Sequence, residues 1–201
     1  MQEHAESETG RERRRLLEGW NSPPNLVTYT RILLVLVFIA LDLMAGPWGE
    51  RRPGMRWTAA VLFILAASTD KLDGWLARRY NQVTELGKLM DPIADKLLIC
   101  SALIVASVFG ELWWWVTVLF LVRELGITLL RVLVINKQGR VIAASRAGKY
   151  KTLFECIGLG MLMVPLSPVW PWYLVTTRVV ILVALALCLY SGAEYVIGMR
   201  Q

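Results

Sequence analysis

The segment Asp70-Lys-Leu-Asp73-Gly74-Trp-Leu-Ala77-Arg78 is followed at short intervals by Gly87, Asp91 and Asp95. Asp70 and Asp73 are three positions apart, and Asp91 and Asp95 are four apart, so each pair shares one face if both segments are helical. A charged side chain at the centre of a membrane-spanning helix costs roughly 2.5–3.5 kcal/mol. The concentration of charge at the ends of apolar segments therefore predicts a polar cavity that several helices line.

Long apolar segments flank this stretch and predict an all-α, polytopic membrane protein. Hydrophobic residues make up 56% of the 201-residue chain, and its mean hydropathy is +0.48, which is more apolar than an ordinary soluble domain. Apolar stretches of about 20 residues are typical of transmembrane helices. We expect six of them, at 26–46, 57–79, 87–109, 112–135, 149–168 and 172–197.

The chain divides into a polar N-terminal leader, 1–23, and a six-helix membrane domain, 24–201. The arginine-rich leader is either a solvated tail or an amphipathic helix that lies against anionic headgroups, because Leu16, Leu17 and Trp20 accompany its arginines. The three cysteines stand inside apolar segments and lack the spacing of a metal site or a disulfide framework.

Loop charges predict the orientation of the chain in the membrane. If the N-terminus is cytoplasmic, most Lys and Arg residues collect on the cytoplasmic side, and Arg51, Arg52 and Arg56 lie on the other. We expect a multi-pass protein of the inner (cytoplasmic) membrane, with both termini and the acidic cavity on the cytoplasmic side. The net charge of +6 fits such loops and anionic lipid headgroups better than a nucleic-acid partner.

The four aspartates predict a divalent-metal site. A short turn joins their two segments, so the carboxylates can converge at one depth, where they would repel one another unless cations were bound. Hard oxygen ligands favour Mg²⁺, Mn²⁺ or Ca²⁺ over zinc, and two such ions could clamp the phosphates of a substrate. The alternative is that the aspartates are structural and pair with basic neighbours, namely Lys71, Arg78, Arg79, Lys88 and Lys96.

Small residues between the aspartates leave room for a ligand. Gly74 lets a ligand approach the helix backbone, and Ala77 is small on the same face. Arg78 could neutralise a phosphate, and Gly87 could let two helices pack closely. For each glycine taken alone, helix packing or capping is the simpler interpretation.

The eight fixed residues of this stretch, at these spacings, resemble the signature of the CDP-alcohol phosphatidyltransferase family. The resemblance covers most of the chain after about residue 22 and implies a homodimer with six membrane helices and an active site open to the cytoplasm. It implies that Asp70, Asp73 and Asp91 hold Mg²⁺ or Mn²⁺, as two ions, which bind the pyrophosphate of a CDP-linked lipid such as CDP-diacylglycerol. It also implies that Asp95 is the general base and can touch metal.

The start of the first helix, Pro24-Asn25-Leu-Val-Thr28-Tyr-Thr-Arg31, resembles the bacterial phosphatidylglycerophosphate synthases within that family. Asn25, Thr28 and Arg31 follow helical spacing and can face the same cavity, with Asn25 and Thr28 assigned to the CDP-lipid; alternatively Asn25 caps the helix and Arg31 reaches the interface.

The acceptor implied by this second resemblance is sn-glycerol 3-phosphate, whose phosphate needs a cationic pocket. Basic residues of the first, fourth and fifth segments could form it, namely Arg31, Arg123, Arg131, Lys149 and Lys151. Phe154-Glu155 stands where the subfamily often has a glutamine, and this departure leaves the acceptor open.

Other interpretations use the same residues differently. Within the family, the acceptor could be inositol phosphate, or phosphatidylglycerol as in a cardiolipin synthase. Outside it, the carboxylates could serve a cation transporter, but transporters place ionisable groups near the midplane and contain repeats, whereas this sequence has its acidic cluster near a helix end. A non-catalytic scaffold is disfavoured by the complete acidic signature.

Overall fold

The described part of the protein consists of helices. The computed structural model describes the backbone of residues 23–80, 85–138, 146–166 and 169–198, and the side chains of these residues except 23–24, 70–80, 85–89, 91–92, 95, 131–138, 146–147 and 149. Within those ranges there are six α-helices, one 3₁₀ turn and no strand. They are α2 (Pro23–Ala45), η1 (Pro47–Gly49), α3 (Pro53–Tyr80), α4 (Glu85–Val108), α5 (Trp114–Gln138), α6 (Arg146–Met163) and α7 (Pro171–Gly198).

Each of the six apolar segments predicted from the sequence corresponds to one α-helix, and most ends agree within a few residues. The largest difference is at the end of the fifth segment, where we expected helix to 168 and α6 ends at Met163. Pro165 explains this early end, because it has no backbone N–H donor and disfavours helical geometry at the residue before it. Pro171 then opens α7, a position that suits proline.

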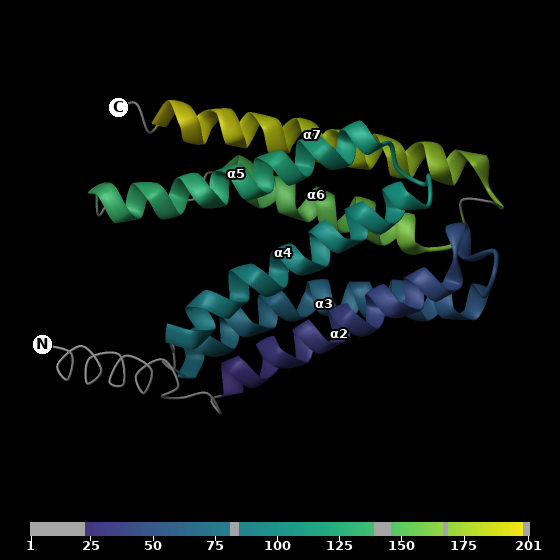
Figure 1. Ribbon diagram of the computed structural model, residues 1–201, viewed down its shortest axis with the longest axis horizontal. Coiled ribbons are helices and arrows are strands. Elements are labelled where there is room, and N and C mark those ends of the chain that lie inside the picture. The colour runs from purple at the N-terminus through teal and green to yellow at the C-terminus, as the bar shows by residue number, and fades with distance from the viewer. Residues whose placement is uncertain (1–22, 81–84, 139–145, 167–168, 199–201) are drawn as a thin grey trace, which may run out of the picture.

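The helices form two antiparallel hairpins with α4 between them (Figure 1). α2 packs along α3 and also contacts α4, whereas α6 packs along α7, which also contacts α5. All six α-helices contribute to one apolar core, which includes Phe38, Phe63, Leu103, Phe120, Leu162 and Ile181. At Gly158 of α6, an added Cβ would lie 2.8 Å from Cγ1 of Ile181, so the absence of a side chain allows α6 and α7 to approach closely.

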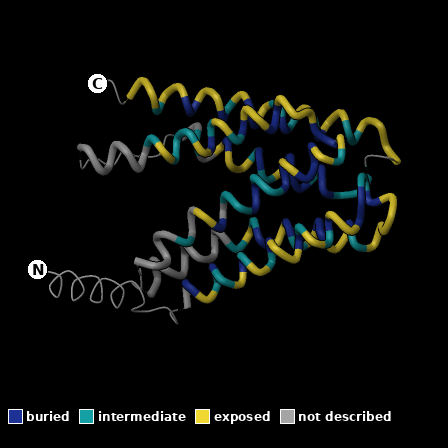
Figure 2. The backbone as a smooth tube through the Cα atoms, viewed as in Figure 1, coloured by how far each residue is buried: buried dark blue, intermediate teal, exposed yellow. Residues whose placement is uncertain are grey.

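Apolar side chains also cover the outer faces of the bundle. Leu33, Val122 and Val175 have exposed fractions of 61%, 65% and 62%, and the exposed positions follow the outward sides of the helices (Figure 2). Among the described residues, two helices, Asn25–Ala45 and Pro171–Gly198, are long and apolar enough to cross a membrane. Extensive exposed apolar surface of this kind is characteristic of contact with lipid or with another protein.

Aromatic side chains gather around the α4–α5 and α6–α7 loops. Trp113 and Trp115 stack with ring centroids 6.1 Å apart, and Trp170 and Trp172 stack at 5.9 Å. The Arg178 guanidinium of α7 lies 4.7 Å from the ring centroid of Trp113, so the two loops lie at the same end of the bundle. Tryptophans gathered at one end of a helical bundle are typical of an aromatic belt at a membrane interface.

A buried ion cluster ties the helices together at this end. Arg56 of α3 is fully buried; its Nη1 donates to Oδ1 of Asp42 in α2 at 2.6 Å, and its Nη2 donates to Oε2 of Glu111, in the α4–α5 loop, at 2.5 Å. Its Nε donates to the carbonyl of Met163, at the end of α6, at 3.0 Å. One guanidinium thereby connects four parts of the chain.

The surroundings of Arg56 correct one interpretation of the sequence. Arg56 was counted with Arg51 and Arg52 as a loop charge that opposes the predicted orientation, but it lies inside the bundle between two carboxylates. It therefore adds no exposed positive charge at this end. The neighbouring turn depends on Gly49, which has a φ of +76° and where an added Cβ would lie 2.8 Å from Cβ of Arg56.

We expect Arg56→Met to lower the free energy of unfolding by about 3–5 kcal/mol, because the substitution leaves Asp42 and Glu111 buried without their cation. Denaturant unfolding of the detergent-solubilised protein measures the change. Arg52→Met is the matched control, since Arg52 is exposed and contacts the Met55 sulfur. Equal stabilities of the two variants would contradict a structural role of the cluster.

Candidate active site

The first turns of α2 direct polar side chains into the bundle. Asn25, Thr28 and Arg31 have exposed fractions of 2%, 1% and 1%, and their spacing of three residues places them on one helix face. Because α2 begins at Pro23, Asn25 lies inside the first turn and not at the N-cap position. Burial also keeps Arg31 from extending along an exposed face of the helix, so the three residues belong to the interior beside α3 and α4.

The Asp42–Arg56 ion pair sets the register between α2 and α3. Thr28 precedes Asp42 by fourteen residues, and Asp70 follows Arg56 by fourteen. At 1.5 Å of rise per residue, both lie about 21 Å along their helices from the ion pair. α2 and α3 run side by side over this length (Figure 1), so Thr28 and the backbone of Asp70 lie at the same level of the bundle.

The backbones of the other aspartates lie at a similar level along α3 and α4. Asp70 precedes Tyr80, the last residue of α3, by ten residues, and Asp95 follows Glu85, the first residue of α4, by ten. Helical rise therefore carries the backbones of the two aspartate pairs to similar distances from the adjoining ends of α3 and α4. Carboxylate oxygens are ligands that suit Mg²⁺ or Mn²⁺, so these backbone positions are compatible with the predicted metal site.

Several predicted site residues lie outside the described side chains. These are the four aspartates together with Gly74, Ala77, Arg78, Gly87, Arg131 and Lys149. Their helices are described, so their positions along the chain are part of the fold, but the metal site and their roles in it stay predictions. Among the side chains that the structure does describe, no group of three or more His, Cys, Asp or Glu residues could hold a metal ion.

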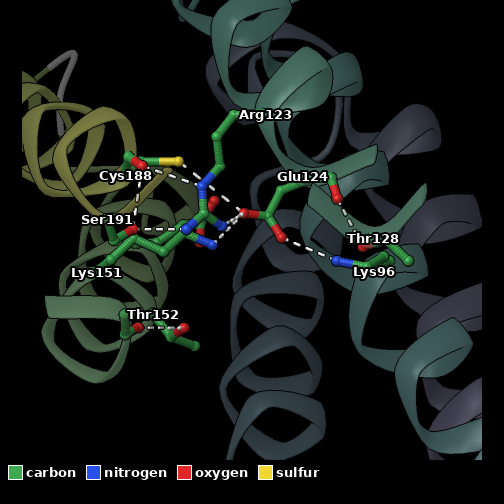
Figure 3. A network of polar contacts seen from close by, with 10 residues as sticks. Lys96, Arg123, Glu124, Thr128, Lys151, Thr152, Cys188 and Ser191 are labelled. Carbon is green, nitrogen blue, oxygen red and sulfur yellow. Dashed lines mark hydrogen bonds and ion pairs between the residues drawn. The ribbon is translucent and has the colours of Figure 1, made fainter. Parts of the chain in front are cut away.

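Glu124 of α5 is the centre of a buried polar network (Figure 3). Its Oε2 accepts from Nζ of Lys96 in α4 at 3.0 Å. Its Oε1 accepts from Nη1 of Arg123 at 2.7 Å and from Nζ of Lys151, in α6, at 2.5 Å. One carboxylate thus draws together three cations from three helices.

The network continues from these cations into α6 and α7. Arg123 donates from Nε to the carbonyl of Cys188 at 3.0 Å and from Nη2 to Oγ of Ser191 at 2.6 Å. Lys151, which is 4% exposed, also pairs with Glu155 one turn further along α6 at 2.7 Å. Two of the predicted acceptor-phosphate residues, Arg123 and Lys151, therefore belong to one hydrogen-bonded unit.

The network is positively charged and adjoins the acidic motif. Three cations and two carboxylates, those of Glu124 and Glu155, leave one excess positive charge. In a buried setting this excess favours an anion more strongly than it would in water. Lys96 directly follows Asp95 in the sequence, so the network begins one residue from the last aspartate of the motif.

Sequence reasoning did not assign a role to Glu124, Lys96 or Ser191. Glu124 had a usable signal, because an acidic residue inside an apolar segment is expensive and marks a functional position by default. Lys96 is likewise a charged residue within an apolar segment, but it was considered only as a possible counter-ion of the aspartates. Ser191 had none, since a serine in a transmembrane segment commonly serves helix packing.

Comparison with known proteins places the chain among membrane-lipid enzymes. The sequence pattern of the family described as CDP-alcohol phosphatidyltransferase matches residues 21–190. A probable phosphatidylglycerophosphate synthase of Mycobacterium tuberculosis strain H37Rv is 45% identical over 172 residues, which cover 86% of this chain and 78% of that protein.

Two further relatives carry the name CDP-diacylglycerol–glycerol-3-phosphate 3-phosphatidyltransferase. The Bacillus subtilis strain 168 protein is 36% identical, and the match covers 86% of this chain and 92% of the relative. The Escherichia coli K12 protein is 32% identical, with 88% and 94% covered.

We expect Gly192→Val to displace Arg123 and to lower the free energy of unfolding by about 1–3 kcal/mol through overpacking. A Cβ at Gly192 would already lie 3.4 Å from Cγ of Arg123, whereas a Cβ at Gly198, on the same helix, would meet nothing within 4 Å. Thermal unfolding of both valine variants in detergent checks this. A Gly192→Val protein as stable as Gly198→Val would contradict the described packing of α7 against Arg123.

Proposed function

Because the chain belongs to the CDP-alcohol phosphatidyltransferase family, we propose that it transfers the phosphatidyl group of CDP-diacylglycerol to sn-glycerol 3-phosphate. The products are phosphatidylglycerol phosphate and CMP, and the reaction is a step of phospholipid biosynthesis. The observation that carries this function is the complete eight-residue signature on α3 and α4, placed one residue from a buried basic network. Relatives named for this activity match along most of their length.

The reaction needs a base and a way to neutralise phosphate charge. Asp95 takes the proton of the acceptor hydroxyl. The hydroxyl oxygen then forms a bond to the phosphorus on the diacylglycerol side, the bond from that phosphorus to the CMP oxygen breaks, and CMP leaves. Asp70, Asp73 and Asp91, with Asp95 as a further ligand, are the residues that would hold two Mg²⁺ or Mn²⁺ ions. Bound there, the ions supply neutralisation of the pyrophosphate and of the leaving phosphate.

Other residues bind the two substrates. Asn25 and Thr28 lie level with the aspartate motif, and Gly74, Ala77, Arg78 and Gly87 belong to the motif itself; we assign these six to the CDP-lipid. Arg31, Arg123, Arg131, Lys149 and Lys151 are assigned to the phosphate of the acceptor. The net positive charge of the network of Lys96, Arg123, Glu124, Lys151 and Glu155 supports this assignment for Arg123 and Lys151, because a buried excess of positive charge attracts an anionic ligand more strongly than an exposed one.

The proposed setting is the inner membrane, which six helices cross with both termini in the cytoplasm. The tryptophans around the α4–α5 and α6–α7 loops lie at one end of the bundle, and the aspartates lie toward the opposite ends of α3 and α4. Aromatic belts mark interfaces, so this separation favours an active site near the other interface, where the water-soluble substrate arrives. The family resemblance further suggests a homodimer.

We expect the purified protein in detergent to release CMP from CDP-diacylglycerol when Mg²⁺ or Mn²⁺ and sn-glycerol 3-phosphate are present, and to stop when a chelator removes the metal. Parallel reactions with inositol phosphate and with phosphatidylglycerol test the other acceptors. CMP release with only one of those two acceptors would support the proposed role of the aspartates and would contradict sn-glycerol 3-phosphate as the acceptor. Ion flux in vesicles without any CMP release would instead favour a transporter.

We expect Asp95→Asn to lower kcat by about 100-fold or more, because an amide cannot accept the hydroxyl proton. Glu50→Gln is the control, since Glu50 is an exposed carboxylate beside η1. Both variants should elute from size-exclusion chromatography as the wild type does. Normal turnover of folded Asp95→Asn would remove Asp95 from the role of base.

A further inference from the structure

We propose that Glu124 is a positioning residue that holds the cations of the acceptor's phosphate subsite in place; this rests on the proposed function. Glu124 touches no reacting atom in this account. It acts through Lys96, Arg123 and Lys151, whose charged groups it brings to its two carboxylate oxygens.

The first argument is electrostatic. Three cations from α4, α5 and α6 lie within hydrogen-bonding distance of one carboxylate, so they are close to one another as well. Like charges repel strongly in a buried environment. Without Glu124, Lys96 would lose its described carboxylate partner and Lys151 would keep only Glu155, so repulsion could turn these flexible side chains away. The carboxylate therefore fixes where these positive charges stand before any phosphate arrives.

The second argument is the position of Glu124 between two parts of the site. Its Oε2 binds Lys96, the neighbour of the proposed base Asp95 on α4, and its Oε1 binds Arg123 and Lys151 on α5 and α6. Among the ion pairs between described side chains, Lys96–Glu124 is the one that joins α4 to α5. Glu124 thus links the helix that carries Asp91 and Asp95 to the basic residues of α5 and α6, in addition to the apolar packing and the Ser107–Thr117 hydrogen bond between α4 and α5.

The third argument is that Arg123 is oriented from three directions. Cys188 and Ser191 of α7 accept from its Nε and Nη2, and Glu124 accepts from its Nη1. The contacts with Cys188 and Ser191 hold Arg123 against α7 without Glu124. Apart from Glu124, the described contacts give Lys151 one further carboxylate partner, Glu155, and give Lys96 none. Loss of Glu124 should therefore disturb the lysines most.

Charge and position predict opposite effects, which makes the inference testable. Glu124→Gln keeps the size of the side chain and removes one negative charge. If Glu124 only weakened the positive charge of the subsite, the variant would bind an anionic acceptor more tightly and its KM for sn-glycerol 3-phosphate would fall. If Glu124 positions the cations, that KM rises although the net positive charge has increased.

The steady-state kinetics of CMP release by the full chain in detergent distinguish a charge-weakening role of Glu124 from a positioning role. We expect Glu124→Gln to raise the KM for sn-glycerol 3-phosphate about tenfold or more, with the KM for CDP-diacylglycerol changed by less than about twofold. Glu124→Asp keeps the charge and should recover part of the loss. Glu194→Gln is the matched control, because Glu194 is an exposed carboxylate on α7.

An acceptor KM that stays constant or falls in Glu124→Gln would overturn the inference, as would equal increases for both substrates. If Glu124→Gln does not fold, Glu124→Asp and the thermal protection conferred by sn-glycerol 3-phosphate carry the test, and protection equal to that of the wild type would overturn it. Absence of turnover by the wild type with this acceptor would overturn the proposed function and the inference together, whereas normal variant kinetics with an active wild type would overturn the inference alone.

Discussion

The cost of burying an unpaired charge governs how this bundle is assembled. At one end, one guanidinium lies between two carboxylates, those of Asp42 and Glu111. Around Glu124, one carboxylate binds three cations. Breaking a buried ion pair from one side is strongly destabilising, whereas an intact pair adds little over apolar packing. The two clusters therefore contribute mainly by specifying which helices meet and in which register.

The elements of the fold were largely predictable from the sequence, because apolar stretches and their interruptions are local features. The six predicted segments match the six described α-helices, and the early end of α6 follows from Pro165, which the sequence also shows. The spacing of the aspartates likewise placed each pair on one helix face. The similar level of their backbones follows from the short separation in sequence between the end of α3 and the start of α4, which is again a local feature.

The contacts between distant helices were not predictable in the same way. Lys96 and Glu124 are 28 residues apart, and Arg123 and Ser191 are 68 apart, and nothing in the local pattern of either segment indicates its partner. The sequence predicted a cationic pocket for phosphate, and the structure shows Arg123 and Lys151 paired with the carboxylate of Glu124. Arg56 shows the same limit, since its sequence neighbours suggested a loop charge and its partners lie on other helices.

The partners of Arg56 are also synthesised at different times during translation. Asp42 precedes Arg56 by 14 residues, Glu111 is 55 residues away, and the carbonyls of Leu162 and Met163 are 106 and 107 away. The α2–α3 hairpin can therefore form with its guanidinium already neutralised by one carboxylate. The later partners join only as the chain through Met163 emerges, so full coordination of this one side chain requires α2 to α6 to have been made and does not wait for α7.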